Sequence, residues 1–556
     1  MSVVDGSGEG ADFREGTVKV GDLEVVLSVT GLAGGTEVHW AVRNARRHIV
    51  HLDRIGLSIA AASDRLLEHG WQSWSVVRRC TRGDTRPERG GVDGWRNAML
   101  IADPGSAGRF VAGDQFLVDE AGVTGFLSAF SHFGTVTVAP SLGETTAWAL
   151  LDGVPLSPGE ERQLDPVWIA AGDPGECYSR FAELWGARSG ARTGAPARPG
   201  WCSWYRYLNS VTPDDVGRAA QQCVRHGLEV VQIDDGHQAA IGEWRSPSPM
   251  WSAGAPSVAR ELVESGLTAG LWTAPFLMGH DTALLADHPS WVLCDERGDP
   301  VGAMHHPGLW GGWAYALDTT HPAVLDHFRS TFHGLVEDGF SYHKLDFLYA
   351  AALAGRHHAR SATRAEALRL GLDAIREAVG EDSFMLGCGC PLGPAVGVVD
   401  AMRVSTDVGR WWTEPPTVGG YPETQSGLRN SVRASVLRAP LHRRLWINDP
   451  DCVLLQPGPG ELSEHHRQLM LDVVAGTGGY TVLSDDLDRY TEEEWTSVER
   501  LVSARHLDTT LDLVDPFAAA PVVRSAGRQL EVDWRGEGRA VLSHSRPART
   551  VVEVAS

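Results

Sequence analysis

Residues 321–347 read HPAVLDHFRSTFHGLVEDGFSYHKLDF. From 321 to 339 apolar residues recur at helical spacing, with Pro322 near the start and Gly339 at the end, both typical of helix boundaries. Residues 342–347 are a short segment of the length of a buried strand, and they carry Asp346 near their end. This stretch therefore predicts an amphipathic helix followed by a strand with an acid at its carboxyl end.

The same alternation runs through the middle of the chain. We predict eight strands, at 201–207, 228–234, 267–276, 342–347, 383–388, 400–407, 444–449 and 480–486. Between and after them we predict helices at 212–227, 257–266, 321–339, 363–380, 463–476 and 491–506. Eight strands over about 300 residues, each followed by a helix or a long loop, predict a central (β/α)8 TIM barrel.

Both flanks of the barrel are rich in strand-like segments. Residues 16–190 show strands and turns with little helical periodicity before about 175, which predicts a β-sandwich. A linker rich in Gly, Ala, Arg and Pro follows at 186–200, and the chain ends with predicted strands at 530–536, 539–545 and 550–556. The expected domains are an N-terminal sandwich (1–190), the catalytic barrel (191–505) and a small C-terminal antiparallel β domain (506–556).

Composition excludes several classes of partner. A net charge of −22 argues against nucleic acid or an anionic membrane surface, because both attract basic patches. No apolar run approaches the roughly 20 residues of a membrane span, and the N-terminus lacks the pattern of a secretory signal. Eight cysteines are sparse and lack zinc-site spacing, so we expect reduced thiols, a cytoplasmic protein and no structural metal.

Acids recur where the predicted strands end, and in a TIM barrel the active site is built at those ends. A single aspartate there is most often a helix cap or a turn residue. Here acids follow five of the eight strands, at Asp234 and Asp235, Asp346, Asp407, Asp449 and Asp485. The chain also has 20 tryptophans, several in clusters, including Trp204 and Trp272 at strand ends. Paired carboxylates in an aromatic pocket that binds hydroxyl groups point to glycoside hydrolysis.

Asp346 and Asp407 are the carboxylate pair that we select, because they end different strands. Lys344 lies two residues before Asp346, so both side chains should face the same side of an extended strand. Its ammonium is expected to keep Asp346 ionised, as a nucleophile requires. Of the 49 basic residues only Lys19 and Lys344 are lysine. We infer that a tight pocket has room for the compact ammonium at 344 and not for a guanidinium.

Six motifs occur in order, each near a predicted strand end. They are GWCSWYRYLNSVT, VVQIDDGHQ, GLWTAPF, YHKLDFLYA, GEDSFMLGCGCPLGPAVGVVDAMRVSTD and LWINDPDC. Together they resemble the shorter bacterial α-galactosidases of glycoside hydrolase family 36. The resemblance covers about 195–490 and continues more faintly at HGWQSWS in the N-terminal region. It implies an N-terminal β-supersandwich, a central barrel, a C-terminal β domain and a retaining mechanism on terminal α-galactosides.

The resemblance also implies a role for each matching residue. Asp346 of KLDF matches the nucleophile and Asp407 of RVSTD the acid/base. The positions that match sugar-binding residues, together with Trp204 at the end of the first strand, form the predicted binding set: Asp234 and Asp235 at O4 and O6, Lys344, Arg403 and Trp272 in the same subsite, Cys388 near O2, and Trp71 and Trp74 on a loop at the pocket rim. The chain departs from the family pattern at His237, where relatives often carry an aromatic residue, and at VSTD (404–407), where some members have a small residue, Gly and Pro before the acid/base. The loop 409–423 could shape leaving-group preference.

Other functions remain open at this point. An α-N-acetylgalactosaminidase or a transglycosidase of the raffinose-synthase kind would share both carboxylates. A non-catalytic carbohydrate-binding protein could keep the pocket. A Schiff-base aldolase using Lys344 would need a neutral amine, which Asp346 on the same face disfavours. No organic cofactor or metal is implied, because two carboxylates suffice for glycoside hydrolysis.

Overall fold

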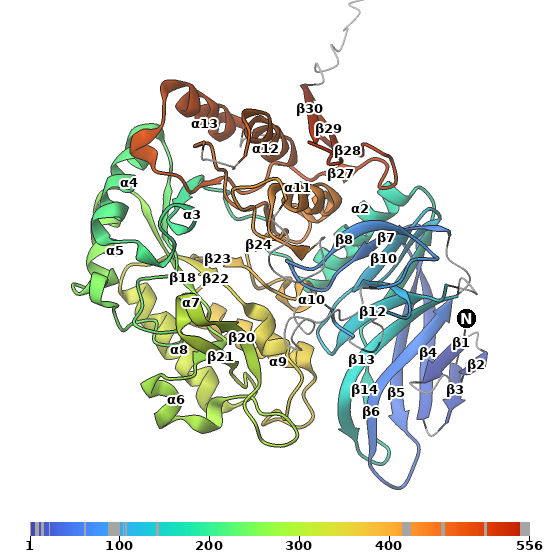
Figure 1. Ribbon diagram of the computed structural model, residues 1–556. Helices are drawn as coiled ribbons and strands as arrows, with labels where there is room; N and C mark the ends of the chain where they lie inside the picture. The colour runs from blue at the N-terminus through green and yellow to red at the C-terminus, as the bar shows by residue number, and fades with distance from the viewer. Residues whose placement is uncertain are drawn as a thin grey trace, which may run out of the picture.

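The computed structural model describes residues 2–5, 10–12, 16–21, 23–59, 63–86, 101–103, 105, 108–140, 144–413, 424–457, 462–504 and 509–544. Figure 1 shows the barrel to the left, two N-terminal sheets to the right and the C-terminal strands above. This arrangement confirms the predicted multidomain fold class, a TIM barrel between two β regions.

Eight parallel strands form the barrel. They are β16 (Gly200–Cys202), β17 (Val230–Ile233), β18 (Thr268–Thr273), β22 (Tyr342–Leu345), β23 (Phe384–Gly387), β24 (Ala401–Arg403), β25 (Ile447–Asp449) and β26 (Val482–Leu483). β26 pairs with β16. Between β25 and β26, the Tyr480 N–H donates to the Asn448 carbonyl, and the Val453 N–H donates to the Val482 carbonyl. All eight predicted strands are present, and each is shorter than predicted.

The first predicted strand, 201–207, is wrong beyond Cys202. Residues Trp204–Tyr207 form the helical turn α3, in which the Tyr207 N–H donates to the Ser203 carbonyl. The Tyr205 N–H donates to Ser484 Oγ at 2.9 Å, which ties this turn to the end of β26. The chain therefore leaves the barrel wall early, and its aromatic side chains come to the mouth of the barrel.

The predicted barrel helices are confirmed. They are α4 (Pro213–His226), α5 (Ala255–Glu264), α8 (Pro322–Glu337), α9 (Arg364–Val379), α12 (Glu464–Thr477) and α13 (Glu492–Ala504). Capping boxes begin α4, α9 and α12. In α4 the box is formed by Thr212 and Asp215, and Gly227 ends the helix with a φ of 71°. The sequence prediction missed α11 (Leu428–Leu437), whose start at Gly427 has no side-chain cap.

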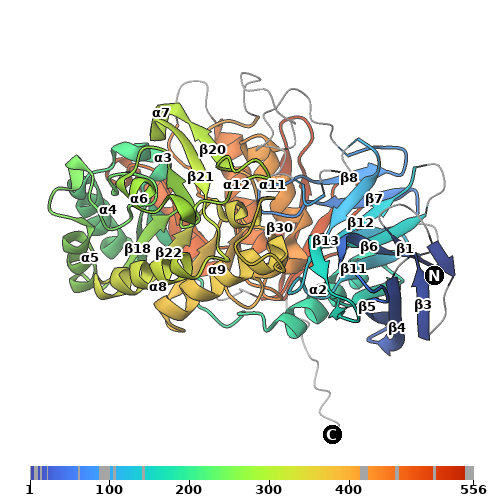
Figure 2. The same ribbon diagram turned by 90° about the horizontal axis from the view of Figure 1, so that it is seen from below.

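A small antiparallel sheet between β18 and β22 was also not predicted. It contains β19 (Leu277–Gly279), β20 (Gly302–His306) and β21 (Gly312–Ala316), with α6 (Ala283–Asp287) and α7 (Pro307–Trp310) in its connections. Figure 2 shows α7 with β20 and β21 at one edge of the barrel. This insertion places His306 and Trp310 beside the ends of the barrel strands.

The N-terminal region has two antiparallel sheets, which confirms the predicted sandwich. One contains β1 (Ser2–Asp5), β2 (Gly10–Asp12), β6 (Val50–Ile59), β9 (Val111–Asp114), β12 (Phe133–Val138) and β13 (Thr145–Leu156). The other contains β3 (Gly16–Val20), β4 (Leu23–Leu32), β5 (Gly35–Asn44), β7 (Arg65–His69), β8 (Val77–Thr81), β10 (Phe116–Asp119), β11 (Gly122–Phe126), β14 (Glu161–Gln163) and β15 (Val167–Ala171). Buried residues of both sheets, such as Val25 and Trp40 from one and Ile55 and Val136 from the other, share one core.

Helix α2 (Pro174–Ser189) leads from the sandwich toward the barrel and occupies the start of the predicted linker. The rest of that linker is held in place, because Arg192 Nε donates to Asp400 Oδ1 at 2.8 Å. After the barrel, β27 (Asp512–Leu513), β28 (Val522–Ser525), β29 (Arg528–Asp533) and β30 (Arg539–His544) form the C-terminal sheet. The predicted strand at 550–556 lies outside the described residues.

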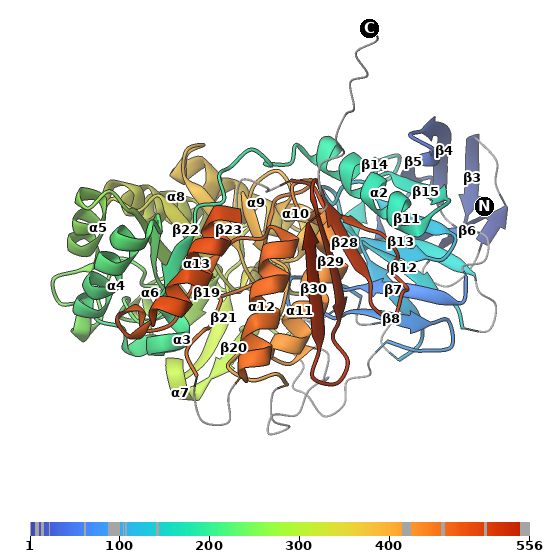
Figure 3. The same cartoon turned by 90° about the horizontal axis from the view of Figure 1, so that it is seen from above.

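The C-terminal sheet packs on α12, as Figure 3 shows. A side chain at Gly476 on α12 would meet the side chain of Leu530 on β29, so the glycine permits this close approach. Within the described residues, none of the helices combines the length and apolar character that crossing a membrane requires.

Candidate active site

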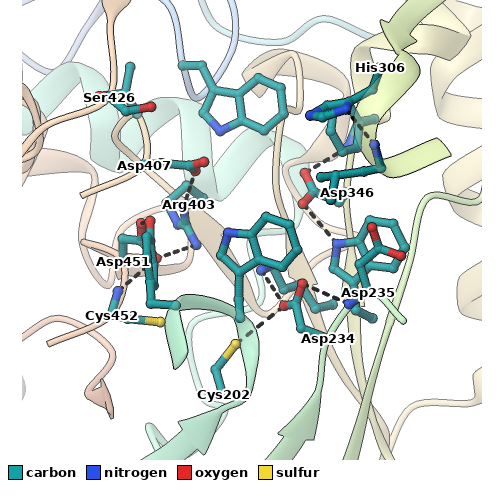
Figure 4. A pocket seen from close by; sticks show the side chains of 18 of the residues that line it. Cys202, Asp234, Asp235, His306, Asp346, Arg403, Asp407, Ser426, Asp451 and Cys452 are labelled. Atoms are coloured by element: carbon teal, nitrogen blue, oxygen red, sulfur yellow. Dashed lines mark hydrogen bonds and ion pairs between the residues drawn. The ribbon is translucent and has the colours of Figure 1, made fainter. Parts of the chain in front are cut away.

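A cavity of about 320 Å³ opens at the carboxyl ends of the barrel strands. Figure 4 shows carboxylate, thiol and aromatic side chains converging on it. Most of the predicted site residues line it, namely Asp234, Asp235, Trp272, Lys344, Asp346, Arg403, Asp407, Trp74 and Trp204. The barrel topology explains this gathering, since strands distant in sequence end at the same rim.

Asp346 follows β22 and is buried, with 7% of its surface exposed. Trp272 Nε1 donates to its Oδ2 at 3.0 Å, and the Phe347 N–H donates to its Oδ1 at 2.8 Å. Phe347 adopts a left-handed φ of 54°, which turns the chain immediately after the carboxylate. One donor thus binds each oxygen and fixes the orientation of the Asp346 carboxylate at the cavity wall.

Lys344 makes its direct ion pair with Asp234, and not with Asp346 as its sequence position suggested. Its Nζ donates to Asp234 Oδ2 at 2.8 Å. Burial alone lowers the pKa of Lys344, but the charges of Asp234 and, more weakly, Asp346 outweigh burial and raise that pKa well above its ordinary value. The lysine is therefore a fixed cation. A Schiff-base role, which needs a neutral amine, is disfavoured.

Asp235 is held by two donors on opposite sides. Trp310 Nε1 donates to Oδ2 at 2.9 Å, and Gln238 Nε2 donates to Oδ1 at 2.5 Å. Burial raises the pKa of Asp235, and these two hydrogen bonds oppose that shift. Trp310 comes from the unpredicted insertion, so this element orients one of the predicted sugar-binding carboxylates.

Asp407 lies beyond the end of β24, where Arg403 Nη1 donates to its Oδ1 at 3.2 Å. Its side chain is 45% exposed and lies among the protein side chains that form the walls of the cavity. Burial within these walls and the negative charge of Asp451 raise the pKa of Asp407 to about 6, and the charge of Arg403 opposes this shift. A carboxyl with this pKa can hold and release a proton near neutral pH, as a general acid/base must.

Two predicted residues lie behind the cavity wall. Cys388 is buried, yet close enough to Asp346 for that charge to raise its pKa in addition to the effect of burial. Trp71 packs in the core, edge-on to Phe133 with ring centroids 5.1 Å apart. Trp74 from the same loop does reach the cavity, where its ring lies edge-on to Phe347 at 5.2 Å.

His237, a departure from the family pattern, supports Trp272 from behind. Its Nε2–H donates to the Trp272 carbonyl at 3.1 Å, and burial lowers the pKa of His237 to about 4. The imidazole is therefore neutral at physiological pH. Of the loop 409–423, residues 409–413 are described, whereas 414–423 lie outside the described residues.

Sequence reasoning missed several lining residues, among them Cys202, His306, Trp310, Thr406, Ser426, Asp451 and Cys452. Two signals were visible: the tryptophan cluster GLWGGWAY contains Trp310, and LWINDPDC contains Asp451. Neither motif shows by itself which side chain turns inward. Among the described residues, no group of three or more His, Cys, Asp or Glu side chains has an arrangement that could hold a metal ion.

The family model described as Melibiase matches residues 202–381, the part of the barrel that contains the ends of β17, β18 and β22. Among solved structures, TtGalA, the α-galactosidase of Thermus thermophilus in complex with p-nitrophenyl α-D-galactopyranoside, aligns with a TM-score of 0.72 and 25% identity over 93% of this chain and 99% of that chain. The chain thus resembles the melibiase family in the sequence of residues 202–381, and it resembles the Thermus α-galactosidase over nearly its whole length. TtGalA in complex with stachyose aligns with a TM-score of 0.70 and 26% identity over 88% and 99% of the two chains.

Melibiase relatives that are more distant share the fold. The GH36 α-galactosidase AgaA of Geobacillus stearothermophilus aligns with a TM-score of 0.63 and 15% identity over 96% of this chain and 80% of that chain. An α-galactosidase of Escherichia coli is 27% identical over 186 residues, which are 32% of this chain and 25% of the relative. The matched region thus spans about a quarter of that curated relative.

Proposed function

We propose that this protein is a member of the melibiase family and an α-galactosidase that removes terminal α-D-galactosyl residues with retention of configuration. The observation that carries the proposal is the pair Asp346 and Asp407, which line one cavity and have different surroundings. Asp346 is fixed by two N–H donors, and Asp407 has a pKa of about 6. A nucleophile and a proton donor need this difference.

The proposed reaction has two displacements. In the first, an Asp346 oxygen bonds to the anomeric carbon, while Asp407 gives its proton to the departing glycosidic oxygen. In the second, Asp407 takes a proton from water, the water oxygen bonds to the anomeric carbon, and the ester to Asp346 breaks. Protons and electron pairs balance over the cycle, and the two carboxyl groups return to their starting states.

The remaining predicted residues have binding roles in this proposal. Asp234, Asp235, Lys344 and Arg403 supply charged partners for sugar hydroxyls, while Trp272 and Trp204 offer apolar faces. Cys388 and Trp71 would act from behind the cavity wall. Because TtGalA was solved with stachyose and AgaA with raffinose, we propose α-galactosyl oligosaccharides as the substrate class.

We also propose the domain limits 1–190, 191–505 and 506–556, with the first domain contributing Trp74 to the catalytic cavity of the second. A cytoplasmic location fits the eight cysteines, all of which are unpaired thiols in the structure.

A panel of aryl glycosides tests the function. The purified protein should hydrolyse p-nitrophenyl α-galactoside and release galactose from raffinose. Preference for the α-N-acetylgalactosaminide, or transfer of galactose to an added sugar in place of hydrolysis, would assign one of the alternative activities on the same fold. Galactose binding without turnover of any member of the panel would contradict the proposal and favour a binding protein.

A further inference from the structure

Asp451 is a buried carboxylate in the cavity wall, and it has no part in the proposed displacements or in the proposed sugar-binding set. It follows β25 by two residues, and 2% of its surface is exposed. Its φ of 79° lies in the left-handed region, which aspartate, asparagine and glycine tolerate better than other residues. This backbone turn directs the carboxylate back toward the ends of β24 and β16.

Both oxygens of Asp451 have two partners. Oδ1 forms an ion pair with Arg403 Nη2 and accepts a hydrogen bond from the Cys452 N–H, both at 2.7 Å. Oδ2 accepts from the Tyr205 hydroxyl at 2.5 Å and from the Val408 N–H at 2.8 Å. The Val408 bond matters most here, since it holds the backbone directly after Asp407.

Arg403 connects the two carboxylates. Its guanidinium donates to Asp407 and to Asp449, both at 3.2 Å, and forms an ion pair with Asp451 at 2.7 Å. The shortest of these contacts is to Asp451, so Asp451 neutralises much of the cation that would otherwise act on Asp407. Figure 4 shows Arg403 between Asp407 and Asp451.

We propose that Asp451 is a positioning residue for the general acid/base. It fixes the backbone that carries Asp407, and it balances the charge of Arg403 so that Asp407 keeps its proton until the leaving group takes it. This inference rests on the proposed glycosidase function and assigns to Asp451 a role that is separate from contact with the sugar.

The charged and titratable groups around Asp407 come from every neighbouring element. Asp451, Arg403, Asp346 and Lys344 act on its pKa, and the charge of Asp407 in turn reaches Tyr205 and Cys388. Asp451 is the largest of the charges that raise the pKa of Asp407. Removing this negative charge should therefore lower that pKa, and Asp407 would lose its proton at a lower pH.

The test is Asp451→Asn, which keeps the shape and suits the left-handed backbone. The basic limb of kcat/KM for raffinose, which has an unactivated leaving group, is expected to move about one pH unit toward acid. That shift corresponds to about a tenfold greater loss at pH 7 than on the acidic side of the profile. The loss with p-nitrophenyl α-galactoside, which needs little protonation, should be smaller.

Asp449→Asn is the matched control, because Asp449 is also buried and also bound to Arg403 but makes neither the Val408 nor the Tyr205 bond. Its basic limb should move less than that of Asp451→Asn. If Asp451→Asn does not fold, Asp451→Gly removes the same charge at a φ that glycine favours. The inference would be overturned if the basic limb of kcat/KM for Asp451→Asn stays at its wild-type pH and both substrates lose the same activity. An inactive wild-type protein would overturn the proposed function instead.

Discussion

Lys344 shows how one residue type can matter in a chain that otherwise uses arginine. Lys344 is 6% exposed, and its ammonium donates to Asp234 and lies in the electric field of Asp346. A guanidinium is planar and broad and would have to displace neighbours such as Cys202 and Trp272 in this small cavity. Lysine and arginine carry the same charge, so the shape of the cavity is what favours lysine at position 344.

Lys344→Arg is expected to lower kcat/KM for p-nitrophenyl α-galactoside by about 100-fold, because misplacing Asp234 disturbs substrate position. Lys19→Arg is the matched control, since Lys19 is the only other lysine and its side chain is 76% exposed. It should match wild type in rate and in thermal unfolding. Wild-type rates from Lys344→Arg would refute selection by shape.

Several site residues could be predicted because a strand end fixes them. Asp234, Lys344 and Arg403 lie on or directly after predicted strands, so their approach to one rim follows from the barrel alone. The partner of Lys344 could not be predicted, because strand spacing sets the face of a side chain and leaves its cross-strand neighbour undetermined. Asp451 reaches the site through a left-handed turn that the sequence does not specify.

At the scale of elements, the insertion that contains β20, α7 and β21 completes the cavity. It places Trp310 so that its Nε1–H donates to Asp235. The Trp310 ring also lies edge-on to the Phe347 ring, with ring centroids 5.2 Å apart. Its strands have only three to five residues and begin or end at a glycine, so neither strand nor helix periodicity marks them. The long regular helices, by contrast, show both periodicity and caps and were predicted.

Trp310→Phe keeps an aromatic ring and removes the Nε1–H that orients Asp235. Since a hydrogen bond to a charged group contributes about 1.5–3 kcal/mol, kcat/KM should fall at least about tenfold. Trp313→Phe on β21 is the control, because Trp313 stacks on His305 on the same sheet and should leave the rate unchanged. Equal effects of the two changes would show that the insertion acts only through its general packing.

At the scale of the whole molecule, the sandwich is joined to the barrel by a buried arginine. Arg438 Nη1 donates to the carbonyls of Ser73 and Val404, both at 2.7 Å, and Nη2 donates to that of Gln72 at 3.1 Å. Ser73 and Gln72 precede Trp74, and Val404 directly follows β24. The contact therefore holds the cavity rim as well as the interface. The family resemblance implied that the loop of Trp71 and Trp74 reaches the pocket rim. The sequence did not predict the arginine that holds this loop, because a single arginine among 47 carries no mark of burial.

Arg438→Met is expected to lower the free energy of unfolding by at least about 3 kcal/mol, because three buried carbonyls lose their donor. Activity should fall at temperatures where the protein is still folded, because Trp74 loses its support. Arg180→Met is the control, since Arg180 forms an exposed pair with Glu183 and should change stability by less than about 1 kcal/mol. Thermal unfolding of both variants measures the difference, and similar unfolding would contradict the assigned role of Arg438.

The proposed retaining mechanism requires a covalent galactosyl-enzyme, and Asp407→Ala allows this intermediate to be trapped. With p-nitrophenyl α-galactoside the first displacement needs little acid assistance, whereas the second needs the missing base, so the galactosyl-enzyme should accumulate. Rapid quenching and peptide mass spectrometry should then find one galactosyl residue on the peptide that contains Asp346. A galactosyl ester on another residue, or an inverted product without any covalent intermediate, would contradict the proposed mechanism through Asp346.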